Sequence, residues 1–292
     1  MNYRVFPCLL LPLVLELGLR AGSAGAVPPG WPPRPSPSPR WEMGAFLAAK
    51  VQYRRSQPPY QLPASGAPRW SSGGAARGGC TVKEAPLIPL MPVETQLNAQ
   101  TGQEPSFFAI ATSERPTFFA YVPQTEARQI DFLLLNEEAG AVLYQKPIQI
   151  SGQPQIISVQ LDSSVPPLKA GVNYRWSFAT ICHPNDESKD TSGNPYIEGL
   201  LQRVELAPAA QQQLQQTAVR DRPKFYAEKG FWLDALTSLA QLRCAAPADP
   251  FLKADWADLI RAIELTKIPE LSHYGLERSI ANAPLQPCNP SN

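Results

Sequence analysis

The stretch from Val172 to Cys182 constrains the fold of this chain more than any other, because its residue types alternate along the sequence. One face of the stretch carries the following five residues: Tyr174, Trp176, Phe178, Thr180 and Cys182. A period of two in aromatic and β-branched residues is the pattern of a β-strand with one buried face. The stretch therefore predicts a strand that lies against an apolar core.

Further short apolar runs surround this strand and are separated by turn residues. The expected strands are 86–91, 106–111, 117–122, 130–135, 141–148, 156–161, 173–182 and 196–206. Residues Glu137 to Gly140 are expected to join two of them as a hairpin loop. Short strands at roughly 8–12-residue spacing, without helices between them, are typical of an antiparallel β-sandwich with immunoglobulin-like topology. A small barrel is the alternative, and the pattern leaves the strand order open.

The sequence changes to a helical period after residue 206. Helices are predicted over 208–219, from Asp221 to Gly230 and over 232–244, and Asp249 is expected to cap a last one. Residues 269–292 have no strong pattern and are expected to be an irregular tail. The predicted fold class is therefore α+β: an immunoglobulin-like antiparallel β-sandwich followed by a small C-terminal α-helical hairpin region.

The first 26 residues have the features of an export signal. Arg4 supplies a positive charge, residues 5–19 are apolar and rich in leucine, and Ala24-Gly-Ala26 fits the cleavage pattern of a signal peptide. The apolar run is shorter than the ~20 residues that a membrane span needs. We therefore expect a mature chain that begins at Val27, lies in the periplasm or outside the cell, and has no transmembrane segment.

Residues 27–79 form a basic arm rich in proline and glycine. The arm has seven Lys/Arg against one acidic residue, whereas residues 80–292 have 17 Lys/Arg against 23 Asp/Glu. Such an arm buries too little surface to fold, so we expect a solvated linker, with contact to anionic envelope polymers as the alternative. An exported chain with an acidic body is not expected to bind nucleic acid. The predicted domains are a signal peptide (1–26), the arm (27–79), the β-sandwich (80–206), a helical region (207–268) and the tail (269–292).

Four cysteines remain once Cys8 is removed with the signal peptide, and an even number in an exported chain favours disulfides. Of the three possible connectivities, we expect Cys80–Cys182 and Cys244–Cys288, because each of these bridges would close one region of the chain. In the chain-entropy model each bridge would contribute roughly 4 to 5 kcal/mol. The competing state is free buried thiols.

The loop after the central strand gathers acidic side chains. Asp186, Glu187 and Asp190 are weak candidates for calcium binding, although their spacing lacks the glycine and the terminal glutamate of an EF-hand loop. His183 follows Cys182, but neighbouring strand residues point to opposite faces, which argues against a catalytic Cys–His pair. The chain has no Gly-x-Ser-x-Gly, no His-Glu-x-x-His and no phosphate-binding glycine loop. We therefore predict no catalytic residue and no cofactor.

Three stretches together resemble a cyanobacterial family of exported proteins, a domain of unknown function known as DUF928. The first is Ser113 to Pro123, the second is 174–182 followed by 196–205, and the third is 226–243. The resemblance covers residues 77 to about 265 and implies an exported protein and a fold unit. It assigns no catalytic residues to this chain. The arm and the Cys244/Cys288 pair look like features of this chain rather than of the family.

The third stretch also looks like one tetratricopeptide hairpin, through Tyr226, Gly230, Ala235 and Pro247. A single such hairpin cannot bury both of its faces, and the sequence contains no second copy. We therefore favour helices that pack on one another and on the sandwich.

Composition and motifs leave three functional hypotheses. The first is a non-catalytic interaction protein of the envelope or periplasm, with envelope proteins or cell-wall polymers as partners. The second is a carbohydrate- or peptidoglycan-binding module that uses exposed aromatic residues such as Tyr196 or Trp232. The third is a hydrolase whose residues are scattered in the sequence.

Overall fold

The computed structural model describes residues 70–71, 86–98, 102–182, 194–265, 275–286 and 288. All of these belong to one structural unit, residues 40–292. Its strands are β1 (Trp70–Ser71), β2 (Ile88–Pro89), β3 (Val93–Asn98), β4 (Gly102–Ala111), β5 (Thr117–Val122), β6 (Gln129–Asn136), β7 (Ala141–Gln149), β8 (Gln155–Gln160), β9 (Asn173–Ile181), β10 (Tyr196–Arg203) and β11 (Leu285–Gln286). Its helices are α2 (Pro208–Gln216), the 3₁₀ turn η1 (Val219–Asp221), α3 (Arg222–Glu228), α4 (Trp232–Ala245), α5 (Pro250–Arg261) and α6 (Leu276–Asn282). The α+β class is confirmed.

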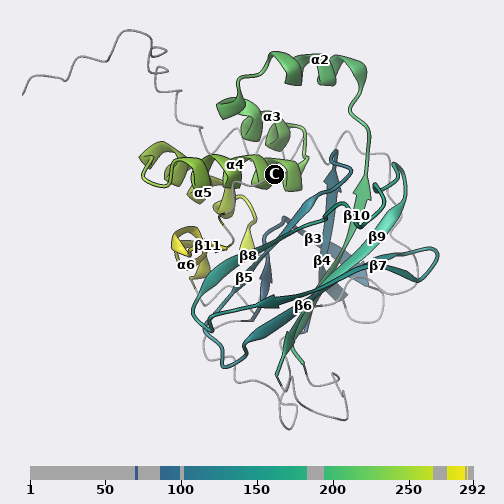
Figure 1. The fold of residues 1–292 in the computed structure, drawn as a ribbon, viewed down its shortest axis with the longest axis vertical. Helices are drawn as coiled ribbons and strands as arrows, with labels where there is room; N and C mark the ends of the chain where they lie inside the picture. The colour runs from purple at the N-terminus through teal and green to yellow at the C-terminus, as the bar shows by residue number, and fades with distance from the viewer. Residues whose placement is uncertain are drawn as a thin grey trace, which may run out of the picture. The chain divides into compact units, whose positions relative to one another are not determined.

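The strands of the described residues form two sheets. The larger has the order β3-β4-β10-β9-β6-β7, with β1 beside β10, and the smaller has the order β11-β8-β5-β2. Both sheets are mixed, because β10 runs parallel to β4 and β11 runs parallel to β8. The expectation of purely antiparallel pairing is wrong at these two places. Figure 1 shows α2 to α5 together on one side of the strands, and α6 and β11 beside β8.

Strand β9 has the alternation that the sequence predicts. Tyr174, Trp176, Phe178 and Thr180 are buried, and the residues between them are only half-buried. The strand lies between β6 and β10. From the smaller sheet, the ring of Phe118 packs against this layer, 6.1 Å from the ring of Trp176. Aromatic side chains therefore join the two sheets into one apolar core.

The hairpin loop between β6 and β7 is the one expected from the sequence. The side-chain oxygen of Asn136 accepts hydrogen bonds from the backbone N–H groups of Glu138 and Ala139. Gly140 has a φ of +61°, a backbone conformation that glycine adopts without strain. The predicted loop is confirmed.

The predicted helices are present, with one shorter than expected. Asp249 caps α5, since its carboxylate accepts hydrogen bonds from the backbone N–H groups of Phe251 and Leu252. The helix expected over 208–219 ends at Gln216 and is followed by η1. Helix α2 has no buried residue, so packing does not extend it.

Two segments contain more structure than the sequence indicated. The tail, expected to be irregular, contains α6 and β11, in which Ile280 and Leu285 are buried. Their apolar runs are too short to stand out in the sequence, and contact with the rest of the fold orders them. In the arm, Trp70 and Ser71 pair with the start of β10. That edge is open to them because β4 pairs only with residues 200–203.

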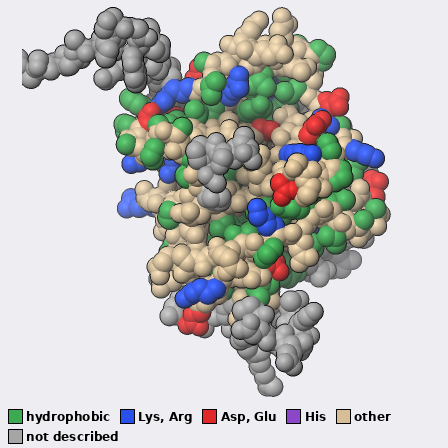
Figure 2. Space-filling view, viewed as in Figure 1, with side chains coloured by type: hydrophobic (Ala, Val, Ile, Leu, Met, Phe, Trp, Pro, Cys, Tyr) green, Lys and Arg blue, Asp and Glu red, His purple; other side chains and the backbone are tan. Residues whose placement is uncertain are grey.

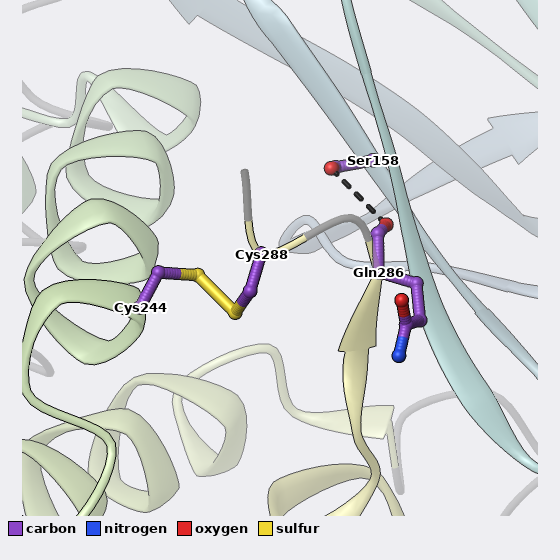
Figure 3. The surroundings of a disulfide bond; sticks show 4 residues. All are labelled: Ser158, Cys244, Gln286 and Cys288. Atoms are coloured by element: carbon purple, nitrogen blue, oxygen red, sulfur yellow. Dashed lines mark hydrogen bonds between the residues drawn. A yellow bond between two sulfur atoms is a disulfide. The ribbon is translucent and has the colours of Figure 1, made fainter. Parts of the chain in front are cut away.

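The Cys244–Cys288 disulfide is present and joins the end of α4 to the segment after β11 (Figure 3). Ser158 of β8 donates a hydrogen bond of 3.3 Å to the backbone oxygen of Gln286 in the same segment. The bridge therefore connects the helices to the smaller sheet, instead of closing a helical region of its own. Cys182 is also disulfide-bonded, and its predicted partner Cys80 lies outside the described residues, so that pairing stays a prediction.

Candidate functional site

Asp234 lies in the first turn of α4 and is only 8% exposed. Its carboxylate accepts hydrogen bonds from the backbone N–H of Thr112 (2.8 Å), the hydroxyl of Thr112 (3.0 Å) and the backbone N–H of Ser113 (3.2 Å). These donors follow directly after β4. Asp234 therefore holds the loop between β4 and β5 against the start of α4.

Burial raises the pKa of Asp234 to about 6, because a charged carboxylate is poorly solvated inside the protein. The hydrogen bonds from Thr112 and Ser113 act in the opposite direction and limit this rise. Nearby, burial also raises the pKa of Tyr226, and the negative charge of Asp234 raises it further. Both oxygens of Asp234 accept from the loop, so its role here is to position the loop.

The loop between β4 and β5 is also held from its other side. The hydroxyl of Ser113 accepts a hydrogen bond from the backbone N–H of Arg115, and the guanidinium of Arg115 donates to the backbone oxygen of Val165 at 2.7 Å. The backbone N–H of Leu168 donates to the backbone oxygen of Glu114 at 3.0 Å. Contacts to α4 and to the connection after β8 therefore fix the loop in one conformation.

A cleft of about 470 Å³ lies beside this loop, with α3 and α4 forming its other wall. Its volume falls within the range of small-ligand sites. Much of its lining consists of side chains that donate or accept hydrogen bonds: Ser113, Arg115, Thr117, Gln160, Arg222, Tyr226, Thr237, Ser238 and Gln241. Such a surface suits a polar ligand with several hydroxyl or amide groups. We call this cavity the polar cleft.

Charged side chains of both signs are interspersed on the face drawn in Figure 2, outside the grey atoms. That face has no large area of a single charge.

A second polar cluster lies on the larger sheet. The guanidinium of Arg175 donates two hydrogen bonds to the carboxylate of Glu137, at 2.7 and 2.6 Å, and lies 3.3 Å from a carboxylate oxygen of Glu198. The hydrogen bonds with Glu137 are the main reason why the pKa of Arg175 is raised. This arrangement connects the β6–β7 loop to β9 and β10, and it therefore stabilises the larger sheet.

The structure does not describe the residues that the sequence predicts as a calcium site. Asp186, Glu187 and Asp190 lie outside the described residues, as does His183, so calcium binding there stays a prediction. Within the described part of the chain, His, Cys, Asp and Glu side chains form no group of three or more that could hold a metal ion. No helix in that part is long and apolar enough to cross a membrane.

The expectation that Trp232 is exposed is wrong. Trp232 is 7% exposed, and its indole N–H donates a hydrogen bond of 3.1 Å to the backbone oxygen of Leu90, between β2 and β3. Because α4 begins against the sheets, its first turn, which includes Trp232, is covered by them. Tyr196 is half-buried at the start of β10.

Sequence reasoning also missed Asp234 and Tyr226 as members of one site. The available signal was a single aspartate within the apolar first turn of the clearest predicted helix. A carboxylate at such a position needs hydrogen-bond donors, which here come from a loop 122 residues earlier. The two residues lie in the third stretch of the family resemblance, and Ser113 begins the first.

In a comparison with protein families, the model described as Domain of Unknown Function (DUF928) matches residues 72–272. The comparison with curated proteins gives no match. The comparison with solved structures gives none either.

Proposed function

We propose that this chain, which belongs to the DUF928 family, is an exported, non-catalytic interaction protein of the cell envelope. The observation that carries the proposal is the hydrogen bonding of Asp234, whose carboxylate lies beside the polar cleft. Both of its oxygens accept hydrogen bonds from Thr112 and Ser113, so it serves to build the cleft wall. The other polar residues of the lining offer hydroxyl, amide and guanidinium groups, which recognise a ligand by hydrogen bonding.

Immunoglobulin-like topology is part of this proposal. The order β10-β9-β6-β7 in one sheet and β8-β5 in the other supports it. A second support is Tyr174 at the start of β9, whose hydroxyl accepts a hydrogen bond of 2.8 Å from the backbone N–H of Lys169, five residues upstream. This resembles the tyrosine corner of immunoglobulin domains. An experimental structure that paired β5 with β6 in a closed barrel would contradict the topology.

The partners that we propose are envelope proteins or cell-wall polymers, and the polar cleft is the proposed contact site. A carbohydrate or peptidoglycan ligand is the second candidate, favoured by the hydroxyl and amide groups of Ser113, Gln160 and Gln241 around the cleft. Trp232 cannot serve as an exposed aromatic platform for such a ligand, because it is buried.

The proposal predicts binding without turnover. The mature chain, beginning at Val27, should be incubated with cell-wall polymer, and both its retention on the polymer and the release of soluble products should be measured. Retention without products is the expected result. Product release that a single point substitution abolishes would contradict the non-catalytic assignment, and absence of retention would remove the wall-polymer ligand.

Export is tested separately from binding. N-terminal sequencing of the protein from the native cell should find a chain that begins near Val27. Cytoplasmic protein that still carries Met1 would contradict the export signal and the envelope location.

A further inference from the structure

A second cavity, of about 860 Å³, lies at the end of α4 that is far from Asp234 in sequence. Residues of α4, α5 and α6 line it. Among the described residues, its charged lining consists of four cations and one acid: Arg243, Lys253, Arg261, Arg278 and Glu277. We call this cavity the basic pocket. None of its described lining residues also lines the polar cleft, although Arg243 directly follows Leu242 of that cleft on α4.

Arg243 is the most informative residue of the basic pocket. The central carbon of its guanidinium lies over the ring of Trp256, 4.7 Å from the ring centroid, and this cation–π contact holds the group in place. One terminal nitrogen, Nη1, is buried and has no hydrogen-bond partner within the described residues. Burial also lowers the pKa of Arg243. A buried donor without an acceptor is costly, and a ligand oxygen would supply the acceptor once the atoms that cover Nη1 move aside.

The other charges leave the basic pocket with an excess of positive charge. Arg261 forms an ion pair with Asp258, so its charge is balanced on α5 itself. Glu277 can balance one of the three remaining cations, Arg243, Lys253 and Arg278. Lys253 and Arg278 are exposed and form no ion pair with another described residue. Two positive charges are therefore uncompensated among the described lining residues.

We propose that the basic pocket binds a ligand through an oxyanion group, a phosphate or a carboxylate. The planar, pre-oriented guanidinium of Arg243 suits the paired oxygens of either group, because arginine donates two parallel hydrogen bonds to them. Lys253 and Arg278 at the rim attract the anion and contact its outer oxygens. This site is independent of the proposed interaction at the polar cleft.

Calorimetric titration with pyrophosphate and with citrate, at matched ionic strength, tests the site and separates the two oxyanion chemistries. The full mature chain should bind at least one probe in a saturable manner. Arg278→Gln should weaken that binding by about ten-fold, or about 1.4 kcal/mol. Because Arg278 is exposed on α6, this variant should fold normally. Arg243→Gln should abolish the binding.

Lys146→Gln, an exposed position on β7, is the control with the same change in charge. It should bind the probe as the unmodified chain does. The proposal is overturned if neither probe binds the unmodified chain, if Arg278→Gln leaves the affinity unchanged, or if Lys146→Gln weakens binding as much as Arg278→Gln does.

Discussion

Asp234 accepts hydrogen bonds from both the backbone N–H and the hydroxyl of Thr112, which lies 122 residues earlier in the chain. The contact links the helical region to the loop that leaves β4. Buried residues of the helices and of both sheets also belong to one apolar core. The described helices and sheets should therefore unfold together, and the polar cleft depends on this link for its shape.

The pH dependence of stability should report on Asp234. Its pKa is about 6 in the folded protein and close to 3.8 when it is unfolded, so the folded state binds the proton more tightly. The stabilisation that this proton provides is complete below the unfolded pKa and is lost as pH rises to the folded pKa. Stability should fall by up to about 3 kcal/mol between pH ~4 and ~6 on this account.

Urea unfolding at a series of pH values measures this contribution. Asp234→Asn should remove the loss of stability between pH ~4 and ~6, whatever its own overall stability. Glu138→Gln, at an exposed position, is the control, and its free energy of unfolding should change with pH as that of the unmodified protein does. If the free energy of unfolding of the Asp234→Asn protein changed with pH in the same way, another group would be responsible for the titration.

Gly199 of β10 pairs with Trp176 of β9, and no side chain fits between them. A Cβ at residue 199 would lie 2.2 Å from the Trp176 ring and 2.8 Å from the backbone oxygen of Phe107. Gly199→Ala should therefore lower the free energy of unfolding by about 1 to 3 kcal/mol. Ser177→Ala, on the neighbouring strand, should change it by less than about 0.5 kcal/mol.

Chemical denaturation of both variants checks this prediction. Combining Gly199→Ala with Trp176→Leu, which removes the large ring, should make the alanine less costly than it is in the unmodified protein. Equal stability of the Gly199→Ala protein and the unmodified protein would show that the two strands are not packed as described.

The sequence predicted well what depends on local periodicity. The expected strand over 117–122 coincides with β5, and the alternation in β9 and the cap at Asp249 are confirmed. These features follow from side-chain spacing and from local hydrogen bonds, which one segment carries alone.

Apart from the Cys244–Cys288 disulfide, several features that depend on contacts between distant segments were not predicted. The parallel pairing of β10 with β4 and the position of β11 depend on how the sheets assemble. The burial of Trp232 depends on Leu90, far earlier in the chain. The candidate site escaped prediction for the same reason, since the partners of Asp234 come from another region and no motif connects them.

Disulfide mapping tests how the C-terminal segment is held. Digestion without reduction should yield a peptide that joins Cys244 to Cys288, and the predicted second peptide joins Cys80 to Cys182. The Cys244–Cys288 bridge spans 44 residues, so Cys288→Ser should lower the free energy of unfolding by about 4 kcal/mol in the chain-entropy model. A peptide joining Cys244 to Cys80, or a Cys288→Ser protein of unchanged stability, would contradict this arrangement.

The central claim is that the chain binds its envelope ligand at the polar cleft, and the most direct test is to close that cleft. Gln241 is exposed at its lining on α4, and Gln212 is exposed on α2 away from it. Retention on cell-wall polymer and on immobilised envelope proteins should be measured for Gln241→Trp, for Gln212→Trp and for the unmodified mature chain. The account predicts that Gln241→Trp loses about ten-fold in affinity while Gln212→Trp binds as the unmodified chain does. Equal binding by Gln241→Trp and the unmodified chain, or no binding by any of the three, would contradict it.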